Sequence, residues 1–183
     1  ACAAVLLHLA SPAFAADETP VPPTVWLRGD ALQVEVSPRL GGRILHVSLP
    51  GAPNLLKVGD AVAAQPDPRV DAEAGDIGYL GHQVWLGPQS QWWTHQDANP
   101  ARRDADAPWP PDPWLSYAAT EVIAQAADQI ELRGPPSTVS GVRIEHRYVL
   151  PAGKAGTLET SATMRNIRTT PVSWDLWFNS RVP

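Results

Sequence analysis

Two kinds of side chain alternate in the stretch GVRIEHRYVLP, residues 141–151. Apolar or aromatic residues and one histidine, His146, occupy the even positions from 142 to 150, and charged residues occupy positions 143, 145 and 147. A period of two places successive side chains on opposite faces of an extended chain. It is typical of a β-strand that is buried on one face, and it places His146 on the buried face, where a core histidine is expected; a place on a ligand-binding sheet is the alternative.

Similar tracts recur along the chain, separated by glycine- and proline-rich turns. Strands are expected within residues 24–38 (a hairpin turning at 28–30), 41–49, 82–86, 117–134 (two strands), 156–167 and 170–182. The tract NLLKV, residues 54–58, is compatible with a short strand, residues 121–128 also with a helical turn, and residues 60–74 are typical of a surface loop. Because no long helical period occurs, the sequence predicts an antiparallel all-β sandwich.

The N-terminus has the features of an export signal. Ala3–Ala10 is an apolar run too short to span a bilayer, and Ala13-Phe14-Ala15 fits a signal-peptidase site. We therefore expect residues 1–16 to be a partial signal peptide, 17–24 a linker and 25–183 the domain, with a periplasmic or secreted location. A buried first strand is the alternative for the apolar run. The single cysteine, Cys2, would be removed with the signal, which excludes disulfides and cysteine catalysis.

The bulk composition limits the possible partners. The net charge of -5 argues against nucleic acid, which is bound by concentrated basic patches. No stretch is long enough for a membrane span, and no cofactor motif is present. Although the chain has 20 prolines, 44% of its residues are hydrophobic and 8 are tryptophan, which favours a folded, loop-rich domain.

Residues 87–113 show neither the strand nor the helix period, and four tryptophans lie in this stretch or directly after it. Loops of this length in compact domains are usually functional or disordered, and disordered segments are poor in aromatic residues. The tract GPQSQWW, which ends in Trp92 and Trp93, is therefore expected to belong to an ordered functional loop.

The last expected strand separates two kinds of side chain. Val172, Trp174, Leu176 and Phe178 fall on one face, and Asp175, Trp177, Asn179 and Arg181 fall on the other. An indole between a carboxylate, an amide and a guanidinium suits a sugar, whose C–H faces stack on rings and whose hydroxyls need polar partners. The alternative is an ordinary outer face on which Trp177 packs under a loop.

Three tracts resemble a bacterial family described as a domain of unknown function, number 4380, which is grouped with galactose mutarotase-like proteins. They are VEVSPRLGGRILHVSL, GHQVWLGPQSQWW with WPPDPW, and TPVSWDLWF, and the resemblance runs from about Val25 to the end. It implies a β-supersandwich whose concave sheet binds carbohydrate. Such a fold is longer than the part of this chain that follows the signal, so we expect the domain to be incomplete at its C-terminus, with an open sheet edge and exposed apolar faces.

The resemblance also implies where catalytic groups would lie. Mutarotases use a histidine as acid and a glutamate as base to exchange anomers. In PVSWDLWFN, Asp175 occupies about the place of that histidine, and the glutamate is expected beyond Pro183. A carboxylate accepts a hydroxyl hydrogen bond but is a poor proton donor at neutral pH, so no catalytic residue is assigned and enzymatic activity stays open.

The candidate ligand-binding residues combine these observations. Trp92 and Trp93 would form a lid, with Gln89 and Gln91 beside them, over a floor of Asp175, Trp177 and Asn179; a loop that seals the sandwich end is the alternative. His95 is a further loop candidate. Arg43 follows two glycines and is either directed inward or a surface residue, and His146 would serve as a substitute acid.

Other chemistries find less support in the sequence. His82, His95 and Asp97 do not have the spacing of a known metal motif, so no metal is expected. Hydrolysis of glycosides needs two carboxylates across a cleft, and the sequence alone does not show whether Asp97, Asp112 and Asp175 lie across one.

The interpretation is an exported carbohydrate-binding mutarotase-like domain. The alternatives are a carbohydrate-active enzyme (epimerase, mutarotase or lyase-like) with further residues beyond this chain, and a structural partner of another exported protein.

Overall fold

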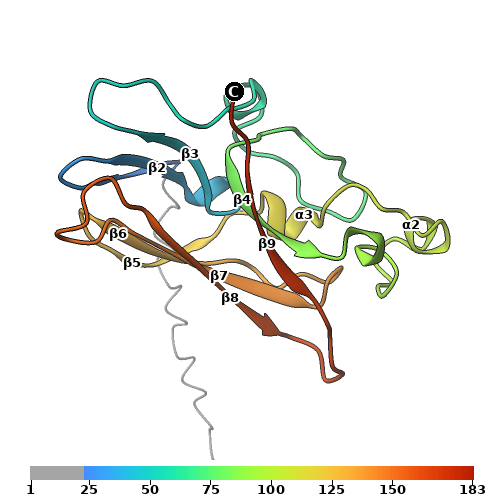
Figure 1. Cartoon of the computed structure of the whole chain (residues 1–183). Coiled ribbons are helices and arrows are strands. Elements are labelled where there is room, and N and C mark those ends of the chain that lie inside the picture. Colours follow the sequence, from blue (N-terminus) through green and yellow to red (C-terminus); the bar gives the residue numbers. More distant parts are fainter. Residues whose placement is uncertain (1–22) are drawn as a thin grey trace, which may run out of the picture.

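The computed structural model describes residues 23–183 (Figure 1). The predicted signal peptide, residues 1–16, and residues 17–22 of the predicted linker lie outside the described residues. Within residues 23–183, nine strands form two antiparallel sheets, which confirms the predicted all-β sandwich. The helices of this part are at most five residues long, and none is long and apolar enough to cross a membrane.

The first sheet has five strands in the order β1-β2-β3-β4-β9. They are β1 (Val25–Arg28), β2 (Gln33–Ser37), β3 (Arg43–Ser48), β4 (His82–Gly87) and β9 (Asp175–Ser180). β4 and β9 pair along their whole length, from His82 opposite Ser180 to Gly87 opposite Asp175. This pairing brings Ser180, on the last strand, beside His82, which lies 98 positions earlier in the sequence.

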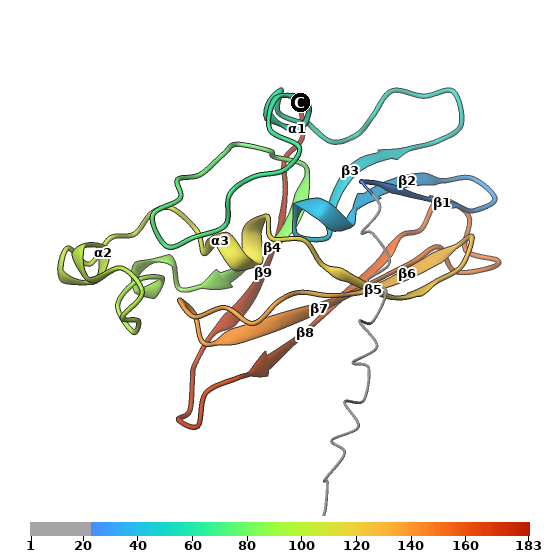
Figure 2. The same ribbon diagram turned by 180° about the vertical axis from the view of Figure 1, so that it is seen from behind.

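The second sheet is a meander of four strands in sequence order. They are β5 (Glu121–Gln125), β6 (Gln129–Arg133), β7 (Val142–Val149) and β8 (Glu159–Asn166). Along β7 the even positions are buried and the odd positions are partly or fully exposed, as the alternation in the sequence predicts. The two sheets lie one over the other, and the view from behind in Figure 2 shows the same two layers.

The space between the sheets holds the hydrophobic core. One cluster joins the inward faces of both sheets, including Val34, Val36 and Ile44 from the first and Ile130, Leu132 and Tyr148 from the second. Each of these side chains is at most 2% exposed. Full burial of such a side chain contributes about 1.5–3 kcal/mol, so the two inward faces account for much of the stability of the sandwich.

A long connection, residues 88–120, joins β4 to β5 and covers one end of the sandwich. It contains the short helices η2 (Gln89–Gln91), α2 (Pro100–Asp104) and α3 (Pro113–Ser116). The side chain of Asn99 caps α2 and that of Asp112 caps α3, each by accepting a backbone N–H. The expectation of an ordered loop is therefore confirmed. Two further short helices, η1 (Pro38–Leu40) and α1 (Ala61–Ala64), precede β3 and β4.

Two local alternatives from the sequence are wrong. Residues 54–58 do not form a strand and make only an isolated bridge, between Val58 and Leu80. The side chain of Asn54 takes the place of a backbone ladder, because its Oδ1 accepts from the backbone N–H of Val47 and its Nδ2 donates to the Leu45 carbonyl. The helical turn considered for residues 121–128 is also absent from the structure, since strand β5 begins at Glu121.

Strand β8 forms one edge of the second sheet and strand β9 forms one edge of the first, and both strands come late in the sequence. Some apolar side chains near these edges are open to solvent: Phe178 on β9 is 48% exposed and Ile167, directly after β8, is 42% exposed. Apolar groups near these two sheet edges are therefore exposed to solvent in the described part of the chain.

Candidate functional site

The outer face of β4 and β9 carries the polar and aromatic residues that the sequence assigned to one side of the last strand. Gln83 lies opposite Asn179 and Trp85 lies opposite Trp177, so these four side chains share a face. The intervening residues of β4, such as Val84 and Leu86, are 2% and 3% exposed and point into the core. The face predicted for Trp177 and Asn179 is therefore the one directed away from the second sheet.

A hollow of about 40 Å³ lies on this face, and we call it the strand-face hollow. The strands supply four of its lining residues, namely Arg43, Gln83, Trp85 and Asn179, and Arg181 directly follows β9. Surface loops supply the rest, namely Asp76, Gly78, Tyr79, Leu80, Gly81 and Trp109. Two of these eleven residues, Arg43 and Asn179, are candidates from the sequence.

Arg43 is directed inward, as one of the two sequence interpretations had it, and is 3% exposed. Its Nη1 donates to the Leu80 carbonyl at 2.5 Å, and its Nη2 donates to the Ser116 carbonyl at 2.8 Å and to the Gln83 side chain. Burial lowers the pKa of Arg43 to about 10, with the Asp76 charge opposing the shift. The guanidinium therefore stays charged at neutral pH, and its buried Nε has no partner among the described residues.

A glycine lets Arg43 reach this position. Gly41 has a φ of 71°, in the left-handed region, and an added Cβ would lie 2.6 Å from the Ser116 carbonyl oxygen. Only glycine allows the chain to approach α3 so closely here. The backbone N–H of Gly41 also donates to the Ala118 carbonyl, which fixes the start of β3 against the long connection.

Arg181 lies on the same face, directly after β9. Its guanidinium carbon is 5.3 Å from the centroid of the Trp85 ring, and its Nη1 donates to Asn179 Oδ1 at 3.2 Å. No carboxylate within residues 23–183 forms an ion pair with it, in contrast to Arg133, Arg147 and Arg165 on the second sheet. Arg181 therefore adds to the hollow a positive charge that is not in an ion pair within residues 23–183.

Aromatic rings line the hollow and continue beyond it. Trp85 meets Trp109 edge-on with ring centroids 5.9 Å apart, and Trp177 lies beside Trp85 in the register of the strands. Trp109 is 44% exposed and Trp177 is 40% exposed, so both present ring surface to solvent. The buried Nε1 of Trp85 has no hydrogen-bond partner among the described residues.

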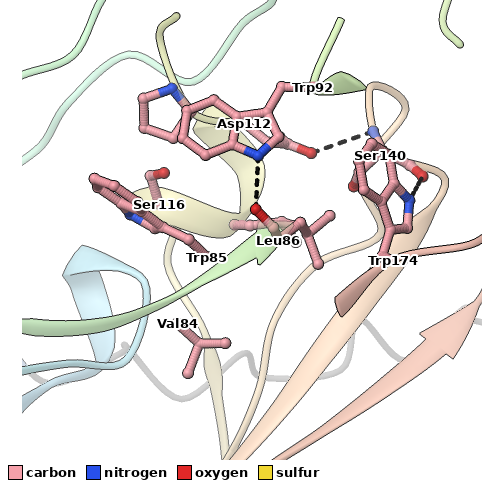
Figure 3. A pocket seen from close by; sticks show the side chains of 10 residues that line it. Val84, Trp85, Leu86, Trp92, Asp112, Ser116, Ser140 and Trp174 are labelled. Carbon is pink, nitrogen blue, oxygen red and sulfur yellow. Dashed lines mark hydrogen bonds between the residues drawn. The ribbon is translucent and has the colours of Figure 1, made fainter. Parts of the chain in front are cut away.

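Trp92 and Trp93 do not form the lid that was expected. They are 3% and 0% exposed, and both indole N–H groups are used internally, by the Leu86 and Pro110 carbonyls, each at 2.7 Å. Figure 3 shows the Trp92 ring over β4 with its nitrogen directed at Leu86. Their rings pack the base of the long connection, as the alternative interpretation of this loop had it, and Trp109 is the ring of this connection that remains exposed.

Figure 3 also shows the interior hollow beneath Trp92, which has a volume of only about 10 Å³. Asp112 lies on its wall, where its carboxylate accepts from the backbone N–H of Trp114 and Ser140 and from the hydroxyl of Ser137. Burial raises the pKa of Asp112 and these hydrogen bonds oppose the shift. Both oxygens are occupied by donors of the protein itself, so this carboxylate ties the long connection to the turn before β7.

The remaining candidates are dispersed. Gln89 donates to the Pro108 carbonyl at 2.9 Å, inside its own loop. Gln91 and His95 are exposed and line a different hollow, of about 250 Å³, beside the turn that precedes β9. His146 is buried between the sheets, and its Nδ1 has no hydrogen-bond partner within residues 23–183; burial, and then the nearby His82, lowers its pKa to about 4. Asp175 is exposed at the start of β9, outside the strand-face hollow.

Two larger hollows have fewer features of a ligand site. The hollow of about 250 Å³ holds one ring, Trp174, whose Nε1 already donates to the Ser140 carbonyl. A hollow of about 600 Å³ at the turn of the β1–β2 hairpin contains no aromatic side chain among its described lining residues. Ligand pockets combine apolar rings with a few converging polar groups. The strand-face hollow meets that description best.

Metal chemistry has no evident place in this part of the chain. Within residues 23–183 no three His, Cys, Asp or Glu side chains lie close enough together to hold a metal ion. His82, which the sequence offered as a ligand with His95 and Asp97, is buried and shares a hydrogen bond of 2.8 Å with Ser180. His95 and Asp97 are exposed on the long connection, and Asp97 pairs with Arg103.

Sequence reasoning missed several residues of the strand-face hollow. Trp85 and Gln83 were visible as alternate positions of the expected strand 82–86, but a one-residue error in register would exchange the two faces. Arg181 was placed on the correct face without being selected. Trp109 and Asp76 come from loops, and nothing in their local sequence indicates that they approach the sheet.

The fold and the site define a two-sheet antiparallel β-sandwich domain that carries an aromatic and polar hollow on the outer face of one sheet. Residues 24–183 match the model of the family described as domain of unknown function DUF4380, and the chain belongs to this family. No curated protein and no solved structure gave a match to this chain.

Proposed function

We propose that this domain binds carbohydrate at the strand-face hollow. The observation that supports the proposal is the pair of exposed rings, Trp109 and Trp177, on the same face as the amides of Gln83 and Asn179. Aromatic faces stack on the C–H groups of a sugar, and side-chain amides both donate to and accept from hydroxyls. Since the hollow has only about 40 Å³, the sugar would lie across its rim with one substituent inside.

The proposal is for binding, without an assigned reaction. Of the described residues that line the hollow, Asp76 is the one that carries a carboxylate. Glycoside hydrolysis uses two carboxylates on either side of the bond that breaks. Asp175 lies at the opposite end of β9 from Arg181, and Asp112 is occupied in the protein interior. No observation on residues 23–183 favours an epimerase or lyase activity over binding alone.

Binding is tested by titrating the purified protein with a panel of hexoses and oligosaccharides while its tryptophan fluorescence is recorded. We expect saturable changes, and we expect Trp177→Ala and Trp109→Ala each to weaken binding by about tenfold, the effect of losing one ring contact. Trp26→Ala is the matched control, because Trp26 is 39% exposed on the same sheet but lies on β1, beside His46. A protein with native circular dichroism that responds to no sugar would contradict the proposal.

We also propose that the protein is exported and works in the periplasm or outside the cell. The support comes from the sequence alone, namely the apolar run Ala3–Ala10 followed by Ala13-Phe14-Ala15. N-terminal sequencing of the protein from its native cell checks this proposal. The mature chain is expected to begin at residue 16 or 17, in the extracytoplasmic fraction. A cytoplasmic protein that retains residues 1–15 would rule export out.

A further inference from the structure

The strand-face hollow has more hydrogen-bond donors and more positive charge than its own residues satisfy. Arg43 and Arg181 both line it, and Asp76 is the carboxylate that opposes them among the described lining residues. One net positive charge therefore remains, although the whole chain carries a net charge of -5. The charge of the hollow therefore has the opposite sign to the net charge of the chain.

Two of the unsatisfied donors are buried. Arg43 Nε and Trp85 Nε1 belong to residues that line the hollow, and neither atom has an acceptor within residues 23–183. A buried donor without a partner costs about 1–3 kcal/mol. Arg181 adds further N–H groups, because within residues 23–183 only the Nη1 of its guanidinium is engaged, by Asn179. The accessible N–H groups of Arg181, with the fixed charge of Arg43 behind them, are complementary to a ligand group that accepts hydrogen bonds and carries negative charge.

The size of the hollow indicates which group fits. A volume of about 40 Å³ exceeds the roughly 15 Å³ that one water needs but is far below the roughly 300 Å³ of a pocket that encloses a whole ligand. A carboxylate fits such a space, and the sugar ring that bears it would remain outside, against Trp109 and Trp177.

We infer that the carbohydrate bound at this site is acidic, and that its carboxylate occupies the strand-face hollow, where it faces the guanidinium groups of Arg43 and Arg181. This inference rests on the proposed function and narrows its substrate class to sugars that carry a uronic acid group. Arg181 provides the accessible charge, held over the Trp85 ring at 5.3 Å. Arg43, buried and fixed by three acceptors, provides a charge that does not move.

The inference is tested with three probes that share one pyranose ring and differ at C6: glucuronic acid, glucuronamide and glucose. Their affinities are measured by fluorescence titration of the purified protein. We expect the acid to bind about tenfold more tightly than the amide or glucose, the usual difference between a charged and a neutral acceptor. In Arg181→Gln the affinity for the acid should fall to that for the amide, and in Arg181→Lys part of the preference should remain.

Arg28→Gln is the matched control, because Arg28 also lies over an indole, that of Trp26 at 5.9 Å, and its removal changes the net charge equally. This variant should keep the full preference for the acid. Equal binding of all three probes, or an unchanged preference in Arg181→Gln, would overturn the inference and leave carbohydrate binding standing. If none of the three probes binds a folded protein, the inference fails, and the proposed function fails with it when the panel of hexoses and oligosaccharides also gives no response.

Discussion

The guanidinium of Arg181 lies over the ring of Trp85, 5.3 Å from its centroid. The two residues are almost a hundred positions apart, and they meet because β9 pairs with β4 in a register that sets Asn179 opposite Gln83. A cation on an exposed indole face gains about 0.5–1 kcal/mol. The contact therefore does little for stability, and its consequence is a fixed positive charge at the edge of the strand-face hollow.

Gly87 leaves the room that the Trp177 ring occupies. A Cβ at position 87 would overlap the Trp177 indole, so Gly87→Ala should displace that ring and weaken sugar binding by about tenfold, as loss of one ring contact would. Fluorescence titration measures the effect. Gly75→Ala is the control, because a Cβ there meets nothing within 4 Å and should leave binding unchanged. Normal affinity in Gly87→Ala would show that Trp177 does not contact the ligand.

Trp92 and Trp93 are expected to affect stability, with little effect on recognition. Trp93→Phe removes the buried hydrogen bond to Pro110 and ring area in the core, and should lower the free energy of unfolding by about 2 kcal/mol. Trp92→Phe loses its bond to Leu86 and should cost a similar amount. Urea denaturation measures both values. Wild-type stability together with lost sugar binding in either variant would restore the lid hypothesis.

Asp112 should be among the side chains whose loss is most costly. Asp112→Ala leaves the N–H of Trp114 and the Ser137 hydroxyl without an acceptor, and the N–H of Ser140 keeps only its bond to Ser137 Oγ. We expect a loss of about 3 kcal/mol in the free energy of unfolding, from the helix cap and the unsatisfied buried donors together. Asp97→Ala is the comparison, since its ion pair with Arg103 is exposed and worth at most about 1 kcal/mol. Equal effects of the two changes would refute this account of Asp112.

His146 should make the stability depend on pH. Burial, and then the nearby His82, lowers its pKa from 6.5 to about 4, so between these values the unfolded chain binds more protons than the folded one. Stability is therefore complete above pH 6.5 and falls as the pH drops toward 4, by up to about 3 kcal/mol from this residue.

His146→Leu removes the titrating group and keeps an apolar side chain of similar size on the buried face of β7. Between pH 4 and 6.5 the variant should lose up to about 1.4 kcal/mol per pH unit less than the wild type. Urea denaturation at a series of pH values measures this slope, and His95→Gln, on the exposed loop, is the control that should keep it. An unchanged slope in His146→Leu would contradict the assignment.

The fold was largely predictable because alternation acts locally. The buried positions of β7 and the two faces of β9 follow from a period of two, which depends only on neighbouring residues. The same reasoning gave a wrong strand at residues 54–58, because the side chain of Asn54 binds backbone groups on β3 that lie seven and nine positions earlier, and it replaces a backbone ladder there.

The site was predictable only in part. Trp177 and Asn179 could be assigned to one face from the strand that contains them, but which ring of the long connection stays exposed depends on packing across the whole end of the sandwich. The adjacent pair Trp92 and Trp93 looked like a ligand surface and is buried, whereas Trp109 in WPPDPW is exposed beside Trp85. A sequence pattern shows that rings are concentrated in a loop, but it does not show which of them the core requires.

The most direct test of the central claim is a ¹⁵N–¹H spectrum of the eight tryptophan indole groups, recorded while an acidic or neutral sugar is added. Binding at the strand-face hollow predicts saturable shifts of the Trp85, Trp109 and Trp177 signals. The signals of Trp26, on β1, and Trp93, in the core, should stay in place. Shifts confined to Trp26 or Trp174, or no shift at saturating sugar, would contradict a binding site on the outer face of β4 and β9.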